Sequence, residues 1–202
     1  MAAIGLRART GRAVAVILAG SSGTPRGVMR RELTLTSPVM PATLQPYHDV
    51  MELPWKRARV RAREAEFVIE AVATEAIREI LLECRSRGLE VTGLGVVGSP
   101  DRDLEAIGNP HIRAHAAEGI LFRRALEVAA ERNGLGQIRE AESGLEARAA
   151  SELGLPLSTV KARLAEFGTT LGRPWRVDER TAAAAAWLAL AGCRASGLGV
   201  VD

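Results

Sequence analysis

The chain has 202 residues, of which 47% are hydrophobic, and this is enough apolar material for one substantial core. No apolar run approaches the roughly 20 residues that a membrane-spanning helix needs, so we expect a cytoplasmic protein without a membrane segment. The net charge of +3 is unevenly distributed, because residues 1–63 carry 11 Lys or Arg against 3 Asp or Glu. Such a basic end is typical of proteins that attract polyanions such as nucleic acid, although a solvated arginine-rich surface would have the same composition.

The first third of the chain predicts a hairpin that follows a basic lead-in. Residues 1–12 contain three arginines without an apolar period, which favours a loose segment outside the core. Residues 13–19 form a continuous apolar run of strand length, and a turn cluster separates them from a second candidate strand at residues 27–36. Residues 37–54 are rich in proline, so we expect at most an edge strand around residues 47–53.

The middle of the chain alternates between helical and strand patterns. A long helix is predicted from about residue 62 to residue 87, and a strand at residues 89–97 would run parallel to the first strand if this helix is a crossover. Apolar residues at spacings of three and four predict a second helix over residues 111–132. A short final strand is expected at residues 134–139, which gives an α/β succession.

A dense run of cations precedes the first long helix, with a positive side chain at almost every second position. We predict that these side chains bind nucleic-acid phosphates, because Lys and Arg provide the sequence-independent part of that interaction. The predicted contacts are Lys56, Arg57, Arg59, Arg61 and Arg63.

Residues 145–168 contain a second candidate for nucleic-acid binding. Gly154 and Pro156 would end one short helix and separate it from a second, on which Val160 and Leu164 share a face. The run Leu-Gly-Leu-Pro-Leu-Ser-Thr-Val-Lys-Ala-Arg-Leu resembles the helix-turn-helix of bacterial sigma factors. That resemblance implies a DNA-binding regulator that uses Lys161 and Arg163.

The C-terminal region provides the resemblance that covers most of the chain. Residues 181–191 are alanine-rich, so this helix can lie very close to a sheet, and Asp178 and Glu179 stand at its N-terminal end. An acid followed by such a helix resembles the last helix of RuvC-type Holliday junction resolvases, in the ribonuclease H-like superfamily. The order of predicted elements agrees, which implies a mixed sheet flanked by helices. We therefore expect one ribonuclease H-like domain over residues 13–192 and a tail at residues 193–202.

The resemblance also makes a demand on the active site. Nucleases of this superfamily hold two metal ions with carboxylates from the first strand, the end of the fourth strand and the last helix. The candidate strands at residues 13–19 and 91–97 contain no acid, and Asp178 and Glu179 are the acids that match a family position. We expect Mg²⁺ and nuclease activity only if carboxylates cluster in space, with Asp101 and His115 nearby; otherwise the site is degenerate.

One further group has the spacing of metal ligands. His111, His115 and Glu118 fall at positions i, i+4 and i+7, so a helix places them on one face, where they would suit a zinc-like divalent ion. The alternative is that His115 and Glu118 line a pocket or that the spacing arose by chance.

These patterns favour a nucleic-acid-binding protein of the resolvase-like type, with DNA rather than RNA as its partner and a homodimer left open. The first alternative is the helix-turn-helix regulator. The second is an oligomeric scaffold or small-molecule protein that has no role with nucleic acid. Loss of binding on neutralising one basic group or the other would distinguish them.

Overall fold

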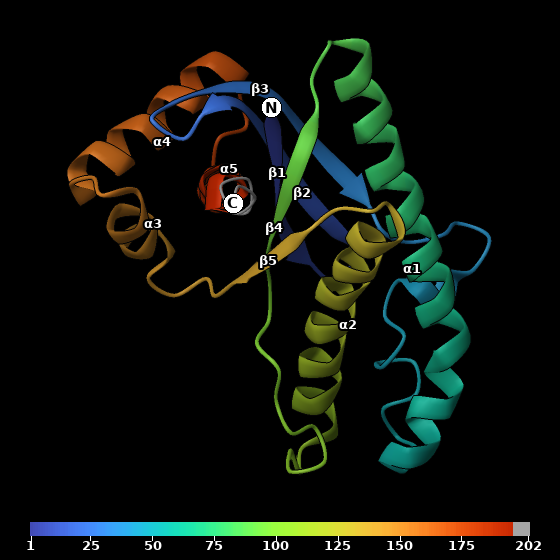
Figure 1. Cartoon of the computed structure of the whole chain (residues 1–202). Helices are drawn as coiled ribbons and strands as arrows, with labels where there is room; N and C mark the ends of the chain where they lie inside the picture. Colours follow the sequence, from blue (N-terminus) through green and yellow to red (C-terminus); the bar gives the residue numbers. More distant parts are fainter. Residues whose placement is uncertain (196–202) are drawn as a thin grey trace, which may run out of the picture.

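The computed structural model describes residues 1–195 and has a mixed five-stranded sheet between two layers of helices (Figure 1). Helices α1 and α2 cover one face of the sheet, and α5 covers the other, accompanied by α3 and α4. This confirms the expected α/β class. The elements are β1 (Ala2–Arg9), β2 (Arg12–Ser21), β3 (Thr24–Thr34), the 3₁₀ turn η1 (Pro41–Thr43), α1 (Trp55–Ser86), β4 (Val91–Val97), α2 (Pro110–Arg132), β5 (Gln137–Glu140), α3 (Leu145–Leu153), α4 (Leu157–Leu171) and α5 (Val177–Ala195).

The expected lead-in at residues 1–12 is wrong, because residues 2–9 form the central strand β1. The sheet order is β3-β2-β1-β4-β5, with β1 antiparallel to β2 and parallel to β4. Alternate residues of β1 enter the two cores: Ile4 and Leu6 pack with α1 and α2, whereas Ala3 packs on the side of α5. The period of two was hidden in the sequence because Arg7 and Arg9 interrupt the apolar pattern.

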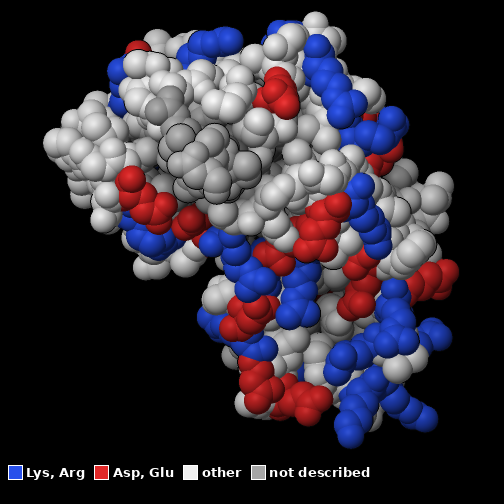
Figure 2. All heavy atoms as spheres, viewed as in Figure 1, with Lys and Arg blue, Asp and Glu red and all other residues white. Residues whose placement is uncertain are grey.

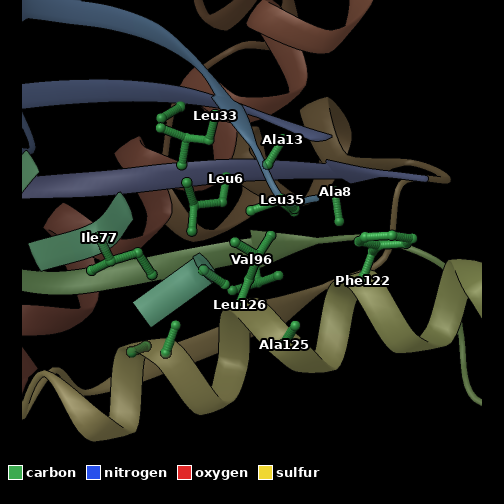
Figure 3. Close-up of a cluster of buried hydrophobic side chains, with 14 of the residues drawn as sticks. Leu6, Ala8, Ala13, Leu33, Leu35, Ile77, Val96, Phe122, Ala125 and Leu126 are labelled. Carbon is green, nitrogen blue, oxygen red and sulfur yellow. The ribbon is translucent and has the colours of Figure 1, made fainter. Parts of the chain in front are cut away.

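Helix α1 begins earlier than expected, and the proline-rich segment before it forms no strand. Pro54 precedes the first turn of α1, where a residue without an N–H group costs no helical hydrogen bond. The basic run at residues 56–63 is therefore helical, and the edge strand expected at residues 47–53 is absent from the described chain. Figure 3 shows the core between the sheet and the helices α1 and α2, where Leu6 and Val96 of the sheet face Phe122 and Leu126 of α2.

Helix α5 lies unusually close to the sheet, as its alanines predicted. A Cβ atom added at Gly5 would lie 1.8 Å from the carbonyl oxygen of Ala182, and one at Gly95 would lie 2.6 Å from that of Ala185. The two glycines stand on neighbouring strands and make room for the helix backbone. This contact fixes α5 with its first turn over the carboxyl end of β1. Residues 193–195 of the expected tail end α5, and residues 196–202 lie outside the described residues.

The two helices of the predicted helix-turn-helix exist as α3 and α4, but both are built into the domain. Val160 and Leu164 are completely buried in the core that contains α5. Helix α4 packs on β3 and α5, while α3 packs on α5.

None of the helices in residues 1–195 combines the length and apolar character required to cross a membrane.

Candidate functional site

A cleft of about 940 Å³ opens at the carboxyl ends of the three parallel strands β1, β4 and β5. The last residues of β1 and β5 and the loop that follows β4 line it, and α2 forms one wall. This edge of the sheet is where the resemblance placed an active site. The lining includes Arg7, Arg9, Asp101, His115, Arg139 and Glu142.

The residue of β1 that lies deepest in its ion-pair group is a buried arginine. Arg7 has 4% of its side chain exposed, and its guanidinium pairs with Glu142. Its Nε lies 3.8 Å from an oxygen of Asp178, which also pairs with Arg9 at 2.6 Å and with Arg12 at 3.5 Å. The hydrogen bonds from Arg9 lower the pKa of Asp178, and burial lowers the pKa of Arg7. Asp178 is therefore an anion held by three arginines.

Glu179, the second predicted catalytic acid, is directed elsewhere. One of its oxygens accepts a hydrogen bond from the backbone N–H of Arg176 at 2.8 Å, and the other lies 3.8 Å from Arg30. Only 6% of its side chain is exposed. These contacts fix the start of α5 against β3, so adjacent residues of one helix serve two different ion-pair groups.

A second ion-pair network lies along the α2 wall of the cleft. The fully buried Arg123 donates to the backbone oxygen of Ser99 at 2.7 Å, to Asp101 at 2.6 Å, and to Glu127. Arg139 of β5 reaches the other oxygen of Asp101 at 2.6 Å and Glu127 at 2.9 Å. The network joins the loop after β4 to α2 and β5. Both carboxylate oxygens of Asp101 are paired with arginines.

The predicted metal ligands on α2 lie beside this cleft, but with a different set of partners. His111 and His115 are exposed and adjacent, and His48 joins them from the loop before α1, giving a group of three imidazoles whose ligand atoms lie within 4.8 Å of one another. Glu118 does not belong to that group. Its buried carboxylate accepts hydrogen bonds from Tyr47 and His48, so its predicted role as a direct ligand does not fit the structure.

The basic run of α1 differs from the arginines of the cleft in its ion pairing. All five predicted side chains are exposed, and none has a carboxylate within ion-pair distance among the described residues. Figure 2 shows Lys and Arg gathered over the N-terminal half of α1, at the lower right of the molecule. This part of the surface offers cations that no ion pair holds among the described residues.

The two cations predicted to contact DNA in the helix-turn-helix differ from each other in exposure and in ion pairing. Lys161 is exposed on α4, whereas Arg163 is half-buried and pairs with Glu166 at 2.9 Å. The two side chains are placed on the outer part of a helix whose opposite face is core. Their use as DNA contacts stays a prediction.

The overall arrangement resembles solved structures of RuvC. A structure described as T. thermophilus RuvC in complex with Holliday junction substrate matches with a TM-score of 0.51 and 15% identity, over 98% of this chain and 96% of that one. A second, described as Thermus thermophilus RuvC structure, gives a TM-score of 0.52 and 16% identity over 97% of both chains. No protein-family model and no curated protein matches the sequence. The chain has the ribonuclease H-like fold of RuvC.

The RuvC-like fold raises the question of whether the residues of the cleft could hold a pair of magnesium ions. Such a pair needs several carboxylates with free oxygens at one place. β1 contains Arg7 near its carboxyl end and no acid, Asp178 and Asp101 are each held by arginines, and Glu179 is directed to β3. Within residues 1–195, the one group of three potential ligands is the histidine group. The donor set of the cleft does not fit two magnesium ions.

Sequence reasoning missed three residues that organise this region of the RuvC-like fold: Arg7, Glu142 and His48. The available signal for Arg7 was the short alternation of small and large apolar side chains at residues 3–6, which ends at this arginine. Glu142 follows the last strand without any pattern that distinguishes it. The chain has only three histidines, and His48 is the one that lies outside α2; this scarcity was the available signal.

Proposed function

We propose that the protein binds the phosphate backbone of duplex or branched DNA through the first turns of α1, without performing two-metal nuclease chemistry. The observation that carries this proposal is the unpaired state of the basic run. Its five side chains are Lys56, Arg57, Arg59, Arg61 and Arg63. Exposed cations without carboxylate partners can replace the counterions of a phosphate chain at little desolvation cost.

The fold supports the choice of DNA as the partner. RuvC, which shares the fold over nearly the whole length of both chains, is described in complex with a Holliday junction. A ribonuclease H-like scaffold can retain a DNA-binding surface after its catalytic residues have changed, because surface charge and metal ligands are separate features. The guanidinium of Arg7 at the end of β1 supports a role without nuclease activity.

The decisive measurement is the salt dependence of DNA binding. A labelled four-way junction and a linear duplex are titrated by fluorescence anisotropy with the wild type and with the triple variant R57Q/R59Q/R61Q. We expect the triple variant to bind about 10- to 100-fold more weakly, and its dependence on log salt to be shallower by about 0.9 for each phosphate contact removed. Tighter binding to the junction than to the duplex would support a branched substrate.

Matched control variants are available on the same helix and on α4. R78Q/R85Q/R87Q removes the same number of arginines from the C-terminal half of α1 and the residue that caps it, where Arg78 and Arg87 are already paired with glutamates. We expect it to bind DNA as the wild type does. An equal loss in both triple variants would contradict a specific role for the first turns of α1.

The helix-turn-helix alternative predicts a different result. If K161Q/R163Q abolishes binding to a defined duplex while R57Q/R59Q/R61Q leaves it intact, the regulator reading replaces our proposal. If neither variant changes binding, the reading as a scaffold or small-molecule protein gains support.

Two further parts of the proposal have their own tests. Incubation of a labelled junction with the protein and Mg²⁺ should give no cleavage, and cleavage that is lost in D178N would overturn the non-nuclease assignment.

A homodimer stays a prediction. Val60 and Phe67 of α1 are each 66% exposed and lie seven residues apart on one face, so light scattering of V60S/F67S tests this surface.

A further inference from the structure

All three histidines of the chain meet at one place, although one is more than 60 positions from the others in sequence. His111 and His115 stand one turn apart at the start of α2, and His48 lies in the loop between η1 and α1. The three rings are arranged edge to face, with centroids separated by 4.3 to 5.1 Å. The fold has therefore collected every imidazole of the protein into one cluster.

The separation of the ring nitrogens suits a small tetrahedral cation. The Nε2 atoms of His111 and His115 lie 3.1 Å apart. Two imidazole nitrogens bound to one zinc ion at about 2.0–2.1 Å in a tetrahedral arrangement lie about 3.3 Å apart. One ligand atom of each histidine lies within 4.8 Å of the others, so modest side-chain rotation brings the third nitrogen to the same point.

The orientation of His48 is fixed by a buried carboxylate. Its Nδ1 lies 2.9 Å from Oε1 of Glu118, a side chain with 1% of its surface exposed. The same oxygen accepts the backbone N–H groups of Tyr47 and His48, each at 3.2 Å. The ring therefore presents Nε2 to the other two histidines, and this atom is buried without a hydrogen-bond partner. A carboxylate behind a histidine is the arrangement that orients imidazole ligands of metals.

We propose that His48, His111 and His115 bind one transition-metal ion of the zinc class, and that Glu118 is the positioning residue for His48. Three imidazoles leave the fourth position of a tetrahedral ion for water or for a bound molecule. His111 and His115 are exposed, so solvent reaches the ion.

The ion would have a structural consequence that is independent of DNA binding. His48 belongs to the long connection between β3 and α1, whereas the other two ligands belong to α2. A bound ion therefore joins this connection to α2 beside the cleft, whose wall includes His115. Binding to the folded chain raises its melting temperature.

The test is a calorimetric titration of the full chain with Zn²⁺ after treatment with a chelator. We expect one ion per chain, and we expect H48A and H111A to weaken binding by at least about 100-fold because each removes a direct ligand. E118Q removes the charged partner of His48 and should weaken binding by about 10- to 100-fold. Zn²⁺ should raise the melting temperature of the wild type and leave that of H111A unchanged.

His111 is exposed, so H111A separates loss of a ligand from loss of the fold; its melting temperature without zinc should equal that of the wild type. E131Q, which changes an exposed acid at the other end of α2, is the matched control and should bind zinc normally. Absence of zinc binding in the wild type would overturn the proposal. Undiminished binding in H48A and H111A would also overturn it, because the ion would then occupy another site.

Discussion

The first turns of α1 and the cleft at the strand ends both concentrate arginines, but the two groups differ in what surrounds them. On α1 the cations are exposed and have no carboxylate within ion-pair distance among the described residues. In the cleft, Arg7 and Arg9 are held by Glu142 and Asp178, while Arg123 and Arg139 are held by Asp101 and Glu127. The first group can bind an external anion directly, whereas the second must first give up an internal one.

The difference follows from where each group lies in the fold. Helix α1 belongs to the helical layer that covers one face of the sheet, and the side chains opposite its buried stripe face water. The cleft receives the first turn of α5, which carries Asp178 to the end of β1. A count of arginines therefore overstates the charge available to a ligand, because pairing decides how much remains free.

The largest effect should come from breaking the contact that brings α5 to β1. Gly5→Val places a branched side chain where a Cβ alone would lie 1.8 Å from the Ala182 carbonyl oxygen. We expect a loss of more than about 3 kcal/mol in the free energy of unfolding, and with it the loss of the Asp178 pairings. Urea denaturation measures this. Gly136→Ala, at a site with open space, should change stability by less than about 0.5 kcal/mol, and equal losses would contradict the close packing.

The next effect distinguishes the buried arginine from an exposed one. Arg7→Ala removes the buried guanidinium between Glu142 and Asp178, and we expect a loss of about 1–3 kcal/mol, since Arg9 and Arg12 still serve Asp178. Arg61→Ala on α1 should stay within about 0.5 kcal/mol of the wild type. Thermal and urea unfolding of both variants check this. A similar cost for the two substitutions would mean that the pairing of Arg7 contributes nothing.

A smaller effect should appear when the cleft is made to resemble α1. The double variant E142Q/D178N removes the carboxylates that neutralise Arg7 and Arg9. If DNA binding depends on free cations, this variant should bind a DNA junction a few-fold more tightly, with a steeper dependence on salt. Fluorescence anisotropy measures both quantities. Unchanged binding would show that the cleft lies outside the DNA contact.

The smallest effect concerns acid stability. The hydrogen bonds from Arg9 lower the pKa of Asp178 in the folded protein. This carboxylate therefore contributes stability above its unfolded pKa of about 3.9, and the contribution is lost as the pH falls through the lower folded pKa. Melting temperatures measured from about pH 6 down to about pH 3 should fall less steeply for D178N than for the wild type. Parallel curves would contradict the pairing.

Much of the fold could be predicted because it follows from local patterns. The first strand of the hairpin is a continuous apolar run of strand length, α2 repeats apolar residues at intervals of three and four positions, and α5 is a run of alanines. The close approach of α5 to the sheet also followed from its alanines. The failures lie at β1 and at the start of α1, where charged side chains concealed the period or favoured a loop.

The candidate sites were predicted only in part. The exposed run on α1 and the histidine pair on α2 are local features, because a helix fixes the relation between residues one turn apart. No local pattern could place Glu142 beside Arg7, since 135 positions separate them. Glu118 was assigned to the wrong role because its partner His48 lies 70 positions away.

The sequence by itself determined an α/β domain with a basic segment and a small-residue helix able to approach a sheet. The tertiary structure decided which charges are neutralised and which imidazoles meet. The physical reason is that backbone periodicity is set by residues a few positions apart. Ion pairs and ligand groups depend instead on the register between strands and on how each helix is placed against them.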